Sequence, residues 1–283
     1  MKGVAGETSV LESVLKHVRQ GGPGVPSVPA AAARIRQMAA SDQAGARELG
    51  GAVGQDPILA AALLRYANSA MYRGLRPVTD LHTAVSRLGI KMVMAAMMAE
   101  LSRSLYRFQD AEDSELFMTL WRHAVACGET SRRVAKLVRY PEPEQAFMVG
   151  LVHDIGKVAS LASLAHLKAR GDIQWPREVA MEFIRETHAT VGSELLRRWK
   201  IPVELCDMVL HHHRELTATS GVALAILQFA DLACGKLGYA QEPTPDASLL
   251  AENSAHILGL NDLTIASLLV DLEEAIPAVT REI

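Results

Sequence analysis

The feature that most limits the fold of this chain is its hydrophobic period. From Ala30 onward almost every segment repeats its apolar residues at helical spacing, and none shows the strict alternation of a half-buried strand. The composition favours helices too, because alanine and leucine dominate and only 5% of the residues are aromatic. With 49% hydrophobic residues, the chain can bury a substantial core. We therefore predict an all-α fold.

Two segments interrupt the helical pattern. The sequence GGPGVPSVP, residues 21–29, holds glycine and proline at a density that no helix interior tolerates, and a polar joint follows at residues 109–113. Asp80 is a typical helix cap, and Gly89 is a typical helix end. The predicted helices span 9–20, 57–72, 81–88, 91–108, 114–139, 142–163, 177–199, 202–214, 220–237, 246–258 and 262–275.

One of these predicted helices carries an unusual set of ionisable groups. The sequence GLVHDIGKVASL, residues 150–161, is apolar on nearly all sides, which is typical of a buried helix. His153, Asp154 and Lys157 nevertheless lie in its middle. A buried carboxylate costs several kcal/mol unless it is paired or bound to a metal. Asp154 therefore needs a cationic partner inside the protein.

More histidines, and a second aspartate, fall on the inward faces of other predicted helices. Helical stripes place His123 and His188 inward, and Asp231 lies in a helix that is almost entirely apolar. In the run 211–213, the same spacing turns the last two histidines inward and the first toward solvent. A lone inward histidine is usually a core residue with a satisfied hydrogen bond.

The whole set, however, needs a common partner. Neutral imidazole nitrogens and carboxylate oxygens are the ligands of Zn, Mn, Fe and Ni, and helix bundles build such sites from facing helices. We therefore predict a metal site, although spacing alone does not show that the side chains converge. Its candidate ligands are His123, His153, Asp154, His188, His212, His213 and Asp231.

The order of these residues resembles a known pattern. The sequence of His, His-Asp and Asp is similar to that of the HD superfamily, whose members are often metal-dependent phosphohydrolases. The segments VPSVPAAAARIRQMAASD, QDPILAAALLRYANSAMY and LHTAVSRLGIKMVMAAMMAEL resemble the N-terminal lobe of the HDOD (HD-related output domain) family, a bacterial signalling module. WRHAVACGETSRRVA, AFMVGLVHDIGK and ETHATVGSELLRRWKIP continue the resemblance in order, so that it extends from about Val25 to Asp231.

The resemblance implies an HD-type helical bundle with an appended N-terminal helical lobe. It divides the chain into an N-terminal helix and linker, an N-terminal lobe, an HD-like lobe and C-terminal helices packed on the same unit, at 1–24, 25–108, 109–240 and 241–283. Transferred residue by residue, it implies a first metal site of His123, His153, Asp154 and Asp231, and a second that adds His188, His212 and His213. The implied cofactor is one or two divalent transition ions of Fe, Mn, Ni or Zn.

Two functions follow from the resemblance. HDOD domains are generally regarded as non-catalytic, which implies a regulatory module that contacts signalling proteins. The retained ligands imply instead a phosphohydrolase acting on a nucleotide or other phosphate ester, in which Asp154 and Lys157 would take part in catalysis. Two departures disfavour hydrolysis of a cyclic dinucleotide: RELTATSG replaces a Gly-Tyr-Pro signature, and Thr119 replaces a glutamate found in some two-metal relatives. We favour the regulatory module.

Net charge and cysteine content limit the kinds of partner and the compartment that we expect. A net charge of −3 argues against nucleic acid, and the basic cluster SRRVAKLVRY is typical of a solvated helix face. The three cysteines lie apart in apolar contexts, as reduced thiols of a cytosolic protein do. With neither a signal-peptide core nor an apolar run of the ~18 residues that a membrane span needs, we expect a soluble cytoplasmic protein without membrane contact. A phosphate-containing small molecule is a further candidate ligand.

Overall fold

The computed structural model describes residues 3–27, 46–54, 57–68, 72, 74, 76–105, 111–217 and 220–281, and within these ranges every regular element is a helix. The all-α prediction is thereby confirmed. The elements are α1 Gly3–Gln20, α3 Ala46–Val53, α4 Pro57–Asn68, α5 Leu81–Leu105, α6 Ala111–Leu137, α7 Pro143–Val152, α8 Ile155–Ala169, α9 Arg177–Arg198, α10 Val203–Leu210, α11 Val222–Lys236, a 3₁₀ turn η1 Leu249–Ala251, α12 Asn253–Ile257 and α13 Asp262–Arg281.

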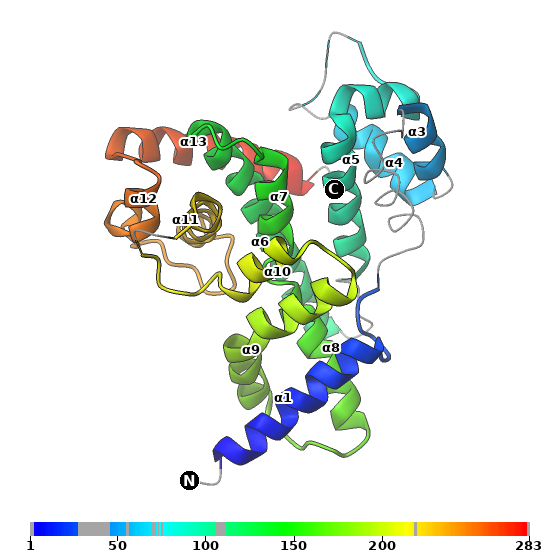
Figure 1. The fold of residues 1–283 in the computed structure, drawn as a ribbon, viewed down its shortest axis with the longest axis vertical. Coiled ribbons are helices and arrows are strands. Elements are labelled where there is room, and N and C mark those ends of the chain that lie inside the picture. Colours follow the sequence, from blue (N-terminus) through cyan, green and yellow to red (C-terminus); the bar gives the residue numbers. More distant parts are fainter. Residues whose placement is uncertain are drawn as a thin grey trace.

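The helices form a bundle around α6 with a smaller group beside it. Helices α3 and α4 pack on α5, and α5 contacts α7 and α6 (Figure 1). Helices α7, α11 and α13 pack on α6, while α8 and α9 pair with each other. The first helix, α1, lies across α8 and α9, far from its neighbours in sequence, and buries Val14 and Val18 completely.

Two hydrophobic clusters hold these helices together. The larger runs from α1 and α3–α5 through α6 to α10, so that it crosses from the N-terminal helices into the bundle. The smaller lies among α6, α11, α12 and α13. Both clusters take side chains from α6, α7 and α11, so these three helices join the two clusters.

In the described residues of the N-terminal part of the chain, most predicted helix boundaries agree with the structure. Asp80 caps α5, because its carboxylate accepts hydrogen bonds from the backbone N–H and the hydroxyl of Thr83, each at 2.8 Å. Gly89 adopts a left-handed conformation, with φ 76°, and breaks the run into two helical pieces as predicted.

The predicted helix over 142–163 is wrong, because the chain forms two helices that meet at His153 and Asp154. The ring of His153 donates its Nδ1–H to the carbonyl of Gly150 at 2.8 Å. In a continuous helix, that carbonyl would accept the backbone N–H of Asp154 instead. A side chain that takes a backbone acceptor competes with the helix, so the chain turns at this point.

The predicted helix over 202–214 is too long for the same reason. Helix α10 ends at Leu210, and the three histidines follow in a turn. The ring of His212 donates its Nδ1–H to the carbonyl of Val209 at 2.6 Å, again three residues earlier. Near the C-terminus, the predicted helix over 246–258 is a turn, a 3₁₀ segment and the short helix α12.

One stretch of the described chain, Pro143–Ala169, is long and apolar enough to cross a membrane by length and composition. The criterion of an uninterrupted apolar run does not detect it, because His153, Asp154 and Lys157 lie within it. The stretch is bent at His153-Asp154, and 83% of its most apolar window is buried inside the protein. It is therefore weak evidence for a membrane span, because the core helix of a globular protein has the same properties.

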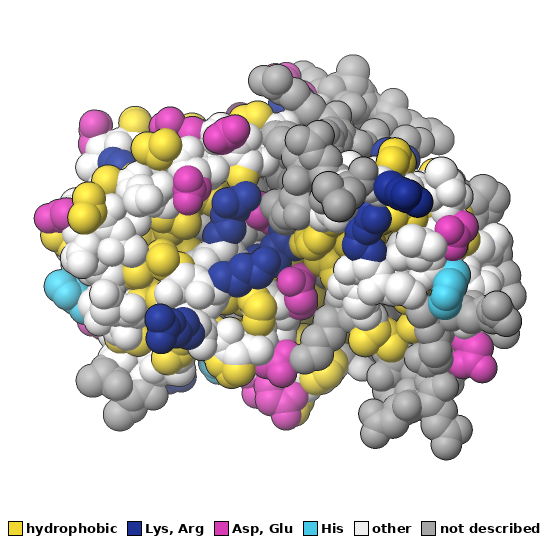
Figure 2. All heavy atoms as spheres, turned by 90° about the horizontal axis from the view of Figure 1, so that it is seen from above, with side chains coloured by type: hydrophobic (Ala, Val, Ile, Leu, Met, Phe, Trp, Pro, Cys, Tyr) yellow, Lys and Arg dark blue, Asp and Glu magenta, His cyan; other side chains and the backbone are white. Residues whose placement is uncertain are grey.

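The basic cluster SRRVAKLVRY is a solvated face only in part. Arg132 is 2% exposed, pairs with the buried Glu129 and lies 5.2 Å from the ring centres of Tyr72 and Phe147. Arg133 also bonds Glu129, at 2.7 Å. Figure 2 shows one face of the molecule, where the Lys and Arg side chains form a small group near the middle, among apolar and acidic ones. Lys136 and Arg139 are exposed, so the prediction of a solvated face holds for them, whereas Arg132 lies inside the protein.

Candidate metal centre

Four histidine rings are fixed by backbone carbonyl groups. In each ring Nδ1 must donate, because a carbonyl oxygen can only accept. In a neutral ring, Nε2 is then left as an acceptor that points into the bundle. These hydrogen bonds run from His123 to Tyr239 at 3.0 Å, from His153 to Gly150 at 2.8 Å, from His188 to Arg185 at 2.8 Å and from His212 to Val209 at 2.6 Å.

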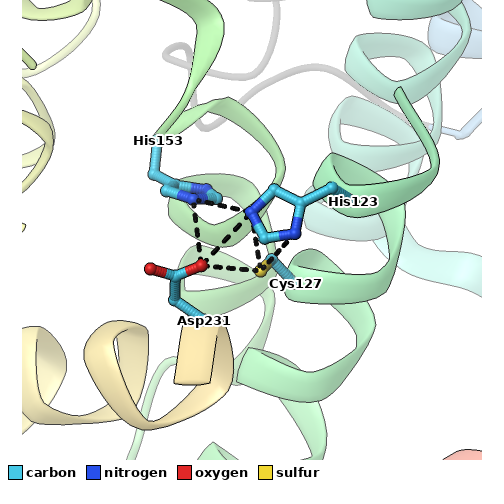
Figure 3. Close-up of side chains that lie close together, drawn as sticks. All are labelled: His123, Cys127, His153 and Asp231. Atoms are coloured by element: carbon cyan, nitrogen blue, oxygen red, sulfur yellow. Dashed lines mark hydrogen bonds and ion pairs between the residues drawn. The ribbon is translucent and has the colours of Figure 1, made fainter. Parts of the chain in front are cut away.

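A first group of donor atoms forms where α6, the end of α7 and α11 meet (Figure 3). His123 Nε2 lies 3.3 Å from His153 Nε2 and 3.2 Å from Asp231 Oδ1. Cys127, one turn after His123 on α6, places its Sγ 3.6 Å from His123 Nε2 and 3.9 Å from Asp231 Oδ1. The four atoms lie within 4.8 Å of one another. We call this set the first group.

A second group lies on the other side of Asp154. His188 Nε2 is 3.3 Å from His212 Nε2 and 3.0 Å from His213 Nε2. Asp154 Oδ1 is 3.2 Å from His188 Nε2 and 3.7 Å from His212 Nε2. The other oxygen, Oδ2, faces the first group, 3.5 Å from His123 Nε2. The Asp154 carboxylate therefore stands between the two groups.

Lys157 neutralises part of the negative charge of Asp154. Its Nζ donates to Asp154 Oδ2 at 2.6 Å, one turn along α8. Burial would raise the pKa of Asp154, but His153, Lys157 and the other histidines hold that pKa well below its ordinary value. Burial would likewise lower the pKa of Lys157, whereas Asp154 raises it. The two groups are thus held as an ion pair.

The histidines differ in their affinity for protons. Burial would lower the pKa of His123, but its hydrogen bond with Asp231 and the charges of both aspartates raise that pKa to about 9. Burial lowers the pKa of His153 to about 4 and that of His213 also to about 4. The last two rings are therefore neutral near pH 7 and offer lone pairs as ligands.

The arrangement fits a divalent transition metal. In the second group the acceptor atoms of His188 and His212 face each other at 3.3 Å and Asp154 Oδ1 at 3.2 and 3.7 Å, and this buried oxygen has no hydrogen-bond donor among the described residues. A proton on His123 would satisfy one contact of the first group and none of the second. Several imidazole nitrogens and a carboxylate are the donors that Zn, Mn, Fe and Ni bind, and carbonyls that orient the far ring nitrogen are typical of metal-binding histidines.

A pocket of about 310 Å³ opens onto the centre. Its inner wall includes His123, Asp154, Lys157 and Asp231. Its remaining charged lining consists of Glu178, Glu182, Arg185 and Glu242. The described pocket therefore has five carboxylates against three cations, Lys157, Arg185 and the protonated ring of His123.

Comparison with known proteins places the chain in a family. The sequence profile of the HDOD domain matches residues 25–215, which is more than half of the chain. This chain belongs to the HDOD family. The resemblance predicted from the sequence is thereby confirmed. An uncharacterized protein of Treponema pallidum (strain Nichols) is 23% identical to this HDOD protein over an alignment of 241 residues, and the match covers 77% of this chain and 44% of that one. The chain thus spans less than half the length of this curated relative.

Three solved structures share the HDOD fold. An HDOD domain protein of unknown function from Geobacter sulfurreducens has a TM-score of 0.71 at 22% identity, with 97% of each chain covered. A candidate metal-dependent phosphohydrolase from Shewanella amazonensis SB2B has a TM-score of 0.68 at 18% identity, covering 95% of this chain and all of that one. A candidate signal transduction protein from Marinobacter aquaeolei VT8 has a TM-score of 0.66 at 20% identity, covering 98% of this chain and 66% of that one.

The HDOD structure brings together all seven residues that the sequence nominated, although their role as ligands stays a prediction. The helical register assumed for the histidine run is wrong, because α10 ends before it. His212 is buried, whereas His213 is exposed at the edge of the second group and His211 is half-buried outside both groups. Thr119, which replaces the glutamate found in some two-metal relatives, uses its hydroxyl to donate to the carbonyl of Glu115 at 3.0 Å.

Cys127 lies beside the candidate ligands, although its apolar context in the sequence predicted an ordinary buried thiol. Its position four residues after His123 places both side chains on one face of α6, and this spacing was the available signal. Burial and the adjacent Cys234 raise the pKa of the Cys127 thiol well above its ordinary value. All three cysteines are free thiols.

Proposed function

We propose that this HDOD protein is a regulatory module of bacterial signal transduction that acts through contacts with protein partners in the cytoplasm. Its HD-type centre would hold one or two divalent transition ions without turnover. Family membership supports the regulatory part, and the convergence of the donor atoms supports the metal. Metal bound only by the folded protein would stabilise the bundle at the point where α6, α7, α8, α9 and α11 meet.

The observation that carries the proposal is the charge of the pocket. The three cations in its described lining already have partners: Lys157 donates to Asp154 at 2.6 Å, Arg185 pairs with Glu182, and His123 pairs with Asp231 at 3.2 Å. Bound ions would offset the charges of Asp154 and Asp231, but Glu178 and Glu242 would keep theirs. A phosphate ester entering this pocket would meet these two glutamates without a free cation beside them, which disfavours binding of an anionic substrate.

A phosphohydrolase is the second candidate, because the same pocket reaches the centre. A bound divalent ion would supply Lewis-acid chemistry and lower the pKa of a bound water molecule. Lys157 would then have to leave Asp154 and donate to a phosphate oxygen. Asp154 and Asp231 would hold the ion rather than touch the substrate.

Elemental analysis and turnover assays on protein purified without chelator or nickel column test the proposal. We expect bound metal, and no hydrolysis of nucleotides, cyclic dinucleotides or p-nitrophenyl phosphate with Mn, Fe, Ni or Zn above the rate of a His212→Ala variant. His211→Ala is the matched control, because this neighbouring ring lies outside both groups. Turnover that survives His211→Ala and disappears in His212→Ala would replace our proposal with the hydrolase.

A further inference from the structure

The outer face of helix α13 exposes an apolar row. Leu263 is 80% exposed and Val270 is 66% exposed, whereas no other large apolar side chain of the described residues exceeds 49%. Seven residues separate the two, so both lie on one face of the helix, with the exposed Ala266 between them. A single exposed leucine is ordinary, but apolar anchors at positions i and i+7 are the means by which helices recognise each other.

The inner face of α13 already has its partner. Its buried residues belong to the smaller hydrophobic cluster, to which α6 also contributes (Figure 1). They are Ile265, Leu268, Leu272 and Ile276. These positions lie about half a turn away from Leu263 and Val270. The outer row therefore takes no part in holding α13 on the bundle.

Carboxylates flank the outer row. Four exposed acidic residues belong to α13, namely Asp262, Asp271, Glu273 and Glu274. None of them forms an ion pair with another described residue. The only basic residue of the helix is Arg281, at its end. Because Asp271 follows Val270 directly and Glu274 comes one turn later, the apolar row is bordered by negative charge.

This charge decides among the candidate occupants of the face. A second copy of the chain would place the carboxylates of one α13 against those of the other, and like charges across a helix pair repel. An anionic membrane surface would repel the same carboxylates. A helix with basic residues beside its own apolar row, in contrast, would satisfy both the apolar and the charged positions.

We propose that the outer face of α13 is the docking surface for an amphipathic helix of a partner protein, whose apolar residues cover Leu263 and Val270 and whose lysines or arginines pair with the flanking carboxylates. The inference rests on the proposed function, because it assigns the protein contacts of that regulatory module to one surface. Helix α13 lies beyond residues 25–215, which the HDOD sequence profile matches. A partner that binds it would therefore recognise a feature outside the shared profile.

Helical peptides test this proposal on the full-length protein. The probes are labelled peptides of about five helical turns, with a leucine row flanked by lysines and arginines. One set of controls has glutamates in place of the basic residues, and a second has the same composition in scrambled order. Fluorescence anisotropy measures the binding. We expect the basic amphipathic peptides to bind and both sets of controls to fail.

Substitutions at exposed sites locate the binding surface. Leu263→Gln and Val270→Gln keep the charge and should fold normally, and each should weaken binding of the basic peptides by about 10-fold or more. Val203→Gln is the matched control, because Val203 is 49% exposed but lies on α10, and it should leave binding unchanged. The double variant Asp271→Lys and Glu274→Lys should reverse the preference between basic and acidic peptides.

Several results would overturn the inference. These are no binding of any basic peptide, binding that Leu263→Gln and Val270→Gln leave unchanged, and equal binding of the acidic or scrambled peptides. Dimers of the wild type that Leu263→Gln abolishes would assign the face to a second copy of the chain. Binding to phosphatidylglycerol vesicles that Leu263→Gln abolishes would assign it to a membrane.

Metal content and phosphate ester turnover are measured on the same variants, whose substituted residues lie outside both groups of the metal centre. Peptide binding together with turnover would refute the non-catalytic part of the proposed function and leave the docking surface intact. No peptide binding, together with bound metal and no turnover, would refute the docking surface and leave the proposed function standing.

Discussion

The closest approach of two helices at the candidate centre makes Gly156→Ala a sharp test of the fold. Gly156 lies in the first turn of α8, against α9. A Cβ atom added there would lie 1.9 Å from the carbonyl oxygen of His188 and 2.5 Å from the backbone nitrogen of Gly192. Both obstacles are main-chain atoms of a helix, so no side chain can rotate away and the two helices must separate.

The magnitude follows from these contacts. Overpacking in a core typically costs about 1–3 kcal/mol, and obstruction by backbone places this site at the upper end or beyond. Replacing glycine by alanine in a helix returns at most about 1 kcal/mol. We therefore expect the free energy of unfolding to fall by about 2 kcal/mol or more, as measured by urea denaturation. Metal occupancy should fall as well, because the shift moves His188 relative to Asp154, and metal–ligand distances tolerate only about ±0.2 Å.

Gly51→Ala is the matched control. Gly51 lies exposed in α3, and a Cβ atom added there meets no atom within 4 Å. The same substitution should therefore stabilise the protein by about 0.5–1 kcal/mol through helix propensity. If Gly156→Ala proves as stable as the wild type and keeps its metal, α8 and α9 do not cross at this distance and our description of the centre is wrong.

Three further predictions concern charged groups. Chelator should lower the unfolding free energy of the wild type by a few kcal/mol and leave Asp154→Asn almost unchanged; an equal response of the two proteins would mean that no metal is held at Asp154. His17 stacks on a histidine of α8, and burial is the main cause that lowers its pKa below 6.5. The unfolded state therefore binds more protons, so stability should fall as the pH drops below 6.5. His17→Gln should reduce this fall in urea denaturation at pH 5–7.5, and identical profiles would contradict it. Arg132→Met leaves the buried Glu129 with fewer cations and should cost about 3 kcal/mol, whereas adding Glu129→Leu should recover part of that loss, as a double-mutant cycle would show.

The sequence predicted the class of the fold and the residues of the site for one physical reason. A helix in a folded protein buries one face, and the spacing of apolar residues records which face that is. This record is enough to place His123, His188 and Asp231 on buried faces. It also identified Asp154 as a carboxylate in need of a cation, and the structure gives it Lys157.

The spacing of apolar residues does not predict where a helix ends if a side chain competes with the backbone for a hydrogen-bond acceptor. The spacing of residues 142–163 is helical throughout, yet the ring of His153 takes the carbonyl of Gly150 and the helix ends. The ring of His212 does the same at Val209, so the assumed register does not apply to the histidine run. Helical periodicity does not take such competition into account, and for that reason it could not locate either turn.

Helical period and the order of the motifs thus determined by themselves that this chain is an all-α member of the HDOD family with a buried set of histidines and aspartates. Only the tertiary structure decided how these side chains meet. The contact of Cys127 with Asp231 joins residues 104 positions apart, and it depends on how α11 packs on α6. The approach of His188 to Asp154 depends on Gly156 and Gly192, which let α8 and α9 cross closely. Periodicity describes one helix at a time, whereas a binding site is set by the distances between helices, which side-chain packing fixes.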